Sequence, residues 1–269
     1  MNHKKFEDLE LKDDFIFGKV MSQKELCKET LEILLGITID DIQYFDTQKS
    51  IDITYEGKSI RLDFYVTDNK DTVYDAEMQQ ESNTSTKKEL PKRSRYYQGI
   101  IDLNLIEKGI PYSKLNQSFV IFICTYDPFN KGLYRYTFQN TCQEDTNIFL
   151  GDETTKIFFN TKGNLEYAPE PLRKFLHYVE TKEAEDAFTK KIDSEIEHIK
   201  SNKTWRREYM KELLHDFDMK EEGRIVGEQR FASLTEKLLK ANRNDDLLKA
   251  TTDLDFRQKL YEEFSLKTS

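Results

Sequence analysis

The chain has 269 residues, enough for one sizeable domain with an appendage or for two small domains, and its net charge of −9 opposes a general attraction to phosphate backbones. Its longest apolar run, residues 119–124, is too short to cross a bilayer and residues 1–14 are polar, so we expect neither a membrane span nor a secretory signal. The three cysteines form no CxxC pair and the four histidines no HExxH motif, which argues against a disulfide framework and a zinc site and indicates a soluble protein of the cytoplasm.

The first 36 residues show the apolar spacing of helices. The large apolar residues Phe15, Met21, Leu26, Leu31, Leu34 and Leu35 recur roughly at helical intervals. Gly36 follows the last of them and is a natural C-terminal stop for a helix.

Strand-like segments follow at residues 42–48, 51–57, 59–68 and 72–80. Gly57 with Lys58, and the polar residues 69–71, predict short hairpin turns between them. A helix is expected at 88–108, closed by Gly109. It opens with a basic cluster, which predicts either a phosphate-binding patch or a solvated, lysine-rich helix start. The cluster consists of Lys87, Lys88, Lys92, Arg93 and Arg95.

The run at 117–126 is apolar on both faces, as expected of a central strand in a sheet covered on both sides. Two further strand-like segments, at 132–140 and 155–161, precede a short helix at 169–179. Asp127–Pro128–Phe129 predicts a turn after the central strand.

The composition changes near residue 181, so we divide the chain into a domain at 1–180 and a charged helical extension at 181–269. One long helix is expected at 204–241, although Gly223 and Gly227 interrupt its pattern. The extension has too few large apolar residues for a core of its own. Its apolar stripe is therefore expected to pack on the first domain or on a second copy, as a homodimer through the C-terminal helices.

Acidic residues mark the two strands at 59–68 and 72–80. Strand alternation puts Asp75, Glu77 and Gln79 on one face, and an antiparallel neighbour brings Asp63 beside Glu77. Two carboxylates and the Met78 carbonyl are oxygen ligands of the kind that Mg²⁺ or Mn²⁺ prefers. The pattern fits either such a metal site or a polar hairpin face in solvent.

A longer series of motifs resembles the Rpn family of recombination-promoting nucleases and transposases, within the PD-(D/E)xK nuclease superfamily. The motifs are, in chain order, DDFIFGKVM, IRLDFYVTD, YDAEMQQ, KRSRYYQGIIDLNLIEKGIPYSKL, FVIFICTYDPFNKGLYRYTF and KIFFNTKG. The resemblance covers residues 12–179. It implies a restriction-endonuclease-like α/β fold with a mixed sheet flanked by helices and a helical C-terminal extension, and a Mg²⁺-dependent DNA endonuclease that hydrolyses phosphodiester bonds.

The resemblance makes Asp63 the metal-binding aspartate and Glu77 the second carboxylate. It places Gln79 where the superfamily motif has its lysine. A glutamine can orient water but carries no charge, which leaves more of the electrostatic stabilisation to metal ions or to basic residues of the following helix.

Other matching positions have two interpretations each. Arg93, Tyr96 and Tyr97 match an R-x-x-Y-Y motif of the family, in which Arg93 would contact the scissile phosphate or a carboxylate, or form a structural ion pair. Asp14 lies in the family's opening motif, where it would join the metal shell or cap a helix.

Two functions remain open. The first is a metal-dependent DNA endonuclease acting in recombination or in defence against foreign DNA. The second is a catalytically inert nuclease-fold module that binds DNA or protein. The two carboxylates favour the enzyme, whereas the negative net charge and the missing lysine favour the inert module.

Overall fold

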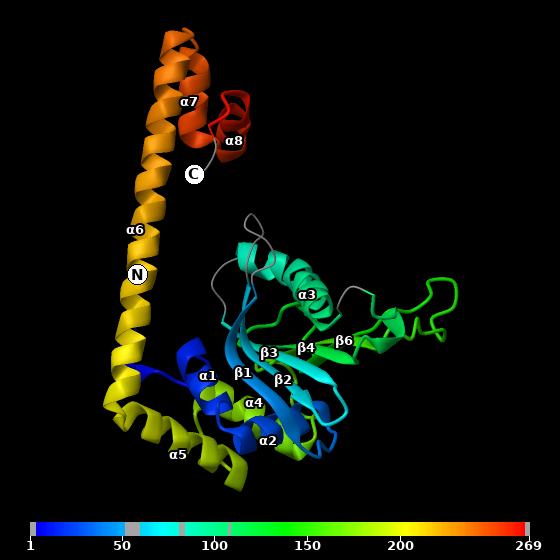
Figure 1. Ribbon diagram of the computed structural model, residues 1–269. Coiled ribbons are helices and arrows are strands. Elements are labelled where there is room, and N and C mark those ends of the chain that lie inside the picture. The colour runs from blue at the N-terminus through cyan, green and yellow to red at the C-terminus, as the bar shows by residue number, and fades with distance from the viewer. Residues whose placement is uncertain (1–3, 52–59, 81–83, 107–108, 267–269) are drawn as a thin grey trace. The chain divides into compact units, whose positions relative to one another are not determined.

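The computed structural model describes residues 4–51, 60–80, 84–106 and 109–266, with side chains except at 44–51, 60–63 and 84. Contacts divide the chain into two compact units, Asn2–Lys203 and Thr204–Ser269. The first unit holds the sheet and the helices that cover it, and the second is helical (Figure 1).

The six strands in the described part of the chain form one sheet in the order β1-β2-β3-β4-β6-β5. Pairing is parallel at β3–β4 and β4–β6 and antiparallel elsewhere, which confirms the expected mixed sheet. The strands are β1 (Ile42–Ile51), β2 (Ile60–Asp68), β3 (Val73–Gln79), β4 (Ser118–Cys124), β5 (Arg135–Phe138) and β6 (Thr154–Asn160).

A turn was predicted on either side of β2, from Gly57 with Lys58 before it and from the polar residues 69–71 after it. Between β2 and β3, Asp68 Oδ1 accepts the N–H groups of Lys70 and Thr72, and Asp71 has a φ of 60°, so the expected turn is confirmed. β1 runs unbroken to Ile51 and so joins the first expected strand to the start of the second. The rest of that second segment, with its turn at residues 57–58, lies outside the described residues.

Helices cover both faces of the sheet (Figure 1). On one face lies α3 (Thr84–Leu105), and on the other lie α1 (Asp14–Met21), α2 (Lys24–Leu35) and α4 (Glu170–Thr181). Short 3-10 turns occur at Phe6–Asp8 and Tyr112–Lys114. α2 ends at Gly36, whose φ of 69° is a left-handed conformation that glycine adopts without strain.

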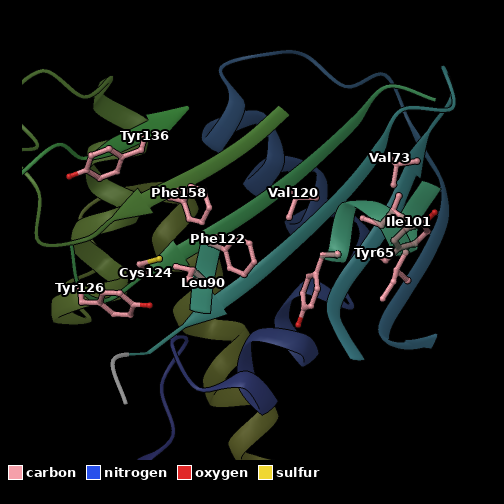
Figure 2. Close-up of a cluster of buried hydrophobic side chains, with 12 residues drawn as sticks. Tyr65, Val73, Leu90, Ile101, Val120, Phe122, Cys124, Tyr126, Tyr136 and Phe158 are labelled. Atoms are coloured by element: carbon pink, nitrogen blue, oxygen red, sulfur yellow. The ribbon is translucent and has the colours of Figure 1, made fainter. Parts of the chain in front are cut away.

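The core beneath α3 is a continuous apolar cluster between this helix and the sheet (Figure 2). Its centre is β4, where Val120 and Phe122 are fully buried toward α3, as expected of a central strand. Phe122 stacks on Phe158 of β6 with ring centroids 5.3 Å apart. Leu90 and Ile101 bring α3 onto this surface and so fix the helix over β3 and β4.

Helix α5 (Ala187–Ser201) belongs to the first unit, whereas the change of composition near residue 181 predicted that it belongs to the extension. It packs on α1, α2 and α4. Phe188, Ile192, Ile196 and Ile199 are buried on one face of this helix, which is why the contacts continue past residue 180. A division of the chain after residue 180 remains a prediction.

The second unit contains most of α6 (Lys203–Lys240), with α7 (Asn244–Thr252) and α8 (Leu254–Glu263). The long helix agrees with the predicted range. The expectation that this region lacks a core is wrong, because apolar residues from all three helices meet. The buried members are Leu234, Leu238, Ala250, Leu260 and Tyr261. None of the helices described in either unit is both long and apolar enough to span a membrane.

Candidate functional site

Strand β3 carries the candidate site. It lies between β2 and β4, so both of its edges are paired, and its alternation directs Glu77 and Gln79 toward α3. Asp75 and Glu77 are 0% exposed, and Gln79 is half-buried at the end of the strand. Glu77 is thus a buried carboxylate inside a sheet, which needs a charged or hydrogen-bonding partner.

Arg93 of α3 is that partner. Its Nη2 lies 2.8 Å from Glu77 Oε2 and its Nη1 lies 2.7 Å from Gln79 Oε1. The Nε–H donates to the phenol oxygen of Tyr97, one helical turn further on, at 2.7 Å. One guanidinium therefore holds two side chains of β3 and one of its own helix in a fixed fork geometry.

Aromatic rings surround the guanidinium. Its central carbon lies 4.9 Å from the centroid of the Tyr97 ring and 5.8 Å from that of Phe122. Rings at this distance attract a cation through their electron-rich faces. The Arg93 side chain is still 36% exposed while Glu77 is fully buried, so the ion pair has one end in the core and the other open to solvent.

The family-like motif of α3 divides between core and surface. Tyr97 is buried, whereas its neighbour Tyr96 is 39% exposed. Burial, and then the negative charge of Glu77, raise the pKa of Tyr97 well above its usual value. The phenol therefore stays neutral at physiological pH and serves as a hydrogen-bonding group for Arg93.

Asp63 lies on β2, and its side chain is outside the described part of the chain. The backbone register is described nearby, where Tyr65 pairs with Asp75 and Val66 with Tyr74 in an antiparallel arrangement. The predicted antiparallel pairing of the two acidic strands is therefore confirmed. That Asp63 and Glu77 share a metal ion remains a prediction.

The start of α1 is joined to the end of β3. Gln80 Nε2 donates to the Lys12 carbonyl at 2.8 Å and to Asp13 Oδ1 at 3.1 Å. Asp13 is the N-cap residue of α1, so the interpretation of Asp14 as the cap is wrong. Asp14 occupies the exposed first turn of the helix. Because Asp13 and Asp14 are adjacent and identical, the sequence alone does not show which of them caps the helix.

The basic cluster of α3 separates into inward and outward groups. Arg93 reaches β3, and Lys87 Nζ lies 4.8 Å from the centroid of the Tyr126 ring. Lys88, Lys92 and Arg95 are exposed, and their spacing of four and three residues places them on one stripe of the helix. The stripe supplies a local positive surface beside the candidate site.

A second group of possible metal ligands was not predicted. His177 Nε2 at the end of α4 lies 3.2 Å from Glu183 Oε2 and 3.6 Å from Glu185 Oε1. Both glutamates are exposed. The three residues follow no familiar spacing, so only the chain reversal after α4 brings them together.

The chain matches a known protein family over most of its length. The family model described as PD-(D/E)XK nuclease family transposase matches residues 11–225. The chain belongs to this family. The family match confirms the resemblance found in the motifs and extends it through α5 into α6. No curated protein and no solved structure matches the chain. Membership of this nuclease family implies DNA as the substrate class.

Proposed function

We propose that this chain is a metal-dependent DNA endonuclease that hydrolyses phosphodiester bonds at a site formed by Asp63, Glu77 and Gln79. The observation that supports it is the convergence of Glu77 Oε2 and Gln79 Oε1 on one guanidinium, at 2.8 and 2.7 Å. Two oxygen acceptors directed at the same point create a place where positive charge is favoured. Oxygen donors of this kind are those that Mg²⁺ and Mn²⁺ select.

Asp63 completes the proposed donor set. If the pairing of Tyr65 with Asp75 continues by two residues along each strand, Asp63 lies opposite Glu77. The Met78 carbonyl, between Glu77 and Gln79 in the chain, is the third proposed oxygen ligand. A bound Mg²⁺ or Mn²⁺ would supply Lewis acidity and an activated water at the scissile phosphate.

Arg93 supplies the charge that the motif's lysine supplies in other members of the superfamily. Its guanidinium is bound to Gln79, at the position of that lysine, and is open to solvent at one end. In this proposal Arg93 stabilises the negative charge that develops on the phosphate. Gln79 orients the attacking water through its amide, and Tyr97 holds the guanidinium in place.

The remaining roles are more peripheral. Asp14, on the exposed first turn of α1, would act on the metal through water, and Tyr96 would contact the substrate from the exposed side of α3. We place the activity in the cytoplasm, in DNA recombination or defence against foreign DNA. Two buried thiols, Cys27 and Cys124, are compatible with a reducing compartment.

We further propose that the chain forms a homodimer through α6. Met210, Leu214 and Phe217 are exposed large apolar residues with the spacing of one helix face. Burial of such a stripe against a second copy about a two-fold axis gives a closed, symmetric interface. Two symmetry-related sites would then address the two strands of a duplex.

The test of the nuclease proposal is nicking of supercoiled plasmid with Mg²⁺ or Mn²⁺, compared with EDTA. We expect nicking by the unchanged protein, and its loss in EDTA and in Glu77→Gln, because the amide lacks the charge that holds the metal. The matched control is Glu89→Gln, which makes the same chemical change at an exposed position of α3. Undiminished nicking by Glu77→Gln would place the catalytic site elsewhere.

The alternative is the inert module, and one observation favours it. Arg93 pairs directly with Glu77, so the buried carboxylate is satisfied by protein alone. The inert module, which binds DNA or protein, predicts no nicking under any metal condition and no requirement of Mg²⁺ for any DNA binding. The same plasmid experiment, with a gel-shift measurement beside it, separates the two functions.

A further inference from the structure

A cavity of about 360 Å³ lies between α3 and the β5–β6 end of the sheet. Three phenylalanines line it and pack on one another. The ring centroid of Phe129 is 5.1 Å from that of Phe138 and 5.2 Å from that of Phe158, and those two are 5.7 Å apart. Phe138 remains 46% exposed, so the aromatic surface is accessible from solvent.

Polar groups complete the lining. Arg95 from α3 and Lys156 from β6 bring two positive charges, and Gln139 and Asn140 bring two amides. Gln139 Nε2 donates to Thr155 Oγ1 at 3.1 Å, which fixes the orientation of this amide. Asn140 Nδ2 donates in turn to the carboxylate of Asp152 at 2.6 Å, which fixes the orientation of the second amide.

This combination matches the chemistry of a nucleotide. A nucleobase stacks on aromatic rings and forms hydrogen bonds to amides through its edge, and its phosphate is attracted by lysine and arginine. The volume falls within the range of small-molecule sites. A cavity of about 500 Å³ between α2, α4 and α5 lacks this match, because it is lined by three carboxylates and one arginine.

The cavity also lies close to the proposed nuclease site. Arg93 is 5.8 Å from the ring centroid of Phe122, and Phe122 stacks at 5.3 Å on Phe158, which lines the cavity. Arg95, at the cavity wall, is the last residue of the exposed stripe formed with Lys88 and Lys92. A DNA strand that follows the stripe therefore passes both places.

We propose that this cavity binds one unpaired nucleotide of the DNA substrate, with its base against Phe129, Phe138 and Phe158 and its phosphate toward Arg95 and Lys156. The preferred substrate is then DNA that contains an extrahelical or single-stranded nucleotide, rather than fully paired duplex. The inference rests on the proposed nuclease function for the identity of the ligand as DNA.

The experiment compares two fluorescein-labelled duplexes of equal length by anisotropy in EDTA, where metal-dependent cleavage is absent. One duplex carries a single unpaired thymidine at its centre and the other is fully paired. The unchanged protein is expected to bind the first more tightly. Phe138→Ala should weaken binding of the first duplex at least about fivefold, the smallest loss expected when one base-stacking ring is removed, and leave the second unchanged.

A second variant tests the phosphate contact. Lys156→Gln should lower affinity for the duplex with the unpaired nucleotide, and reduce the slope of log affinity against log salt by about 0.7 to 0.9. The matched control for Phe138→Ala is Phe149→Ala, which removes an exposed ring from the connection between β5 and β6, outside the cavity. It should bind both duplexes as the unchanged protein does.

Three results would overturn the inference: no preference by the unchanged protein, equal weakening of both duplexes by Phe138→Ala, or no effect of that variant. Thermal unfolding of Phe138→Ala and Phe149→Ala, measured beside the unchanged protein, detects misfolding separately. Phe138→Ala should unfold at a somewhat lower temperature, because its ring packs on Phe129 and Phe158, but still in one cooperative transition. Binding in EDTA is independent of catalysis. A clear preference for the unpaired nucleotide without any plasmid nicking would contradict the nuclease proposal and leave the nucleotide site standing.

Discussion

At the scale of single residues, the contact between Arg93 and Gln79 offers an explanation for a glutamine where the superfamily motif has a lysine. The guanidinium donates to Gln79 Oε1 and to Glu77 Oε2, so it is bound to the residue that the family resemblance puts at the lysine position. An amide that accepts from arginine and a lysine that carries its own charge are therefore two ways to place one positive charge beside the buried carboxylate.

Gln79→Lys should consequently reduce activity rather than restore it. The new ammonium would lie against the Arg93 guanidinium, now 2.7 Å from the amide oxygen, and two like charges repel strongly in a partly buried site. We expect nicking by Gln79→Lys to fall at least about tenfold, which corresponds to ~1.4 kcal/mol in the barrier. The measurement is the initial rate of plasmid nicking under saturating Mg²⁺.

The double variant Gln79→Lys with Arg93→Gln supplies the control. It moves the amide from the strand to the helix and the positive charge from the helix to the strand, so one positive charge remains in the site. Activity should recover above that of either single variant, which is a coupling of neighbouring residues rather than an additive loss. Additive losses would show that Arg93 and Gln79 act independently.

The contacts of the site that were predictable are those between residues close together in the sequence. The common face of Glu77 and Gln79 follows from strand alternation, which is local, and the structure has this arrangement. Whether Arg93 would contact the scissile phosphate or a carboxylate, or form a structural ion pair, was left open. That choice depends on α3 lying over β3, which is a property of tertiary packing around Leu90 and Ile101.

At the scale of elements, the turn between β4 and β5 is held by one carboxylate, that of Asp127. Asp127 accepts hydrogen bonds from the N–H groups of Phe129, Asn130 and Gly132 and from the hydroxyl of Tyr136. Burial alone would raise the pKa of Asp127, but these hydrogen bonds, led by that of Gly132, lower it below its usual value. The turn also holds Phe129 at the wall of the proposed nucleotide cavity.

Asp127→Asn should destabilise the protein by about 1 kcal/mol at neutral pH, because bonds to a charged acceptor are replaced by weaker ones. A lowered folded pKa stabilises the fold above the unfolded value of about 4, and this contribution is lost as pH falls through the folded pKa. The difference between the two proteins in free energy of unfolding should therefore shrink below about pH 4. Denaturant titrations at neutral and acidic pH measure it; a difference that is constant with pH would contradict the role of the charge.

The elements of the C-terminal unit show where sequence reasoning failed. The long helix α6 was predicted from its spacing, but its apolar stripe was judged too sparse for a core. Leu234 and Leu238 come from α6, and Ala250 and Leu260 come from α7 and α8. Each helix contributes only one or two of these fully buried residues, too few to predict a core from one stretch of sequence. The turns at Asn242 and Asp253 bring the residues of the three helices together.

At the scale of the whole molecule, the proposed dimer predicts a change in mass on truncation. The informative truncation ends at Lys203. A chain that ended before α5 would expose the faces of α1, α2 and α4 on which this helix packs. By light scattering, the full chain should be dimeric and the truncated chain monomeric. A full-length chain that is monomeric at tens of micromolar would contradict the dimer.

A point variant provides the matched test of the interface. Phe217→Glu places a charge in the exposed apolar stripe of α6 and should give a monomer, since burial of an unpaired carboxylate is costly. Asp218→Glu, at the adjacent exposed position, keeps the charge of the unchanged chain and should leave the mass unaltered. Loss of the dimer in both variants would mean that the helix, rather than the stripe, was damaged.

The parallel pairing of β3 with β4 has a consequence for synthesis on the ribosome. Glu77 pairs with Phe122 and Gln79 with Cys124, so the strand that carries the acid is completed by residues translated only after the whole of α3. A nascent chain that ends in α3 already contains Glu77 and Arg93, yet one edge of β3 has no strand to pair with. Non-local pairings of this kind form late in folding. The proposed nuclease site therefore assembles only when the central strand has been made, and a prematurely terminated chain would expose an open β edge instead of this site.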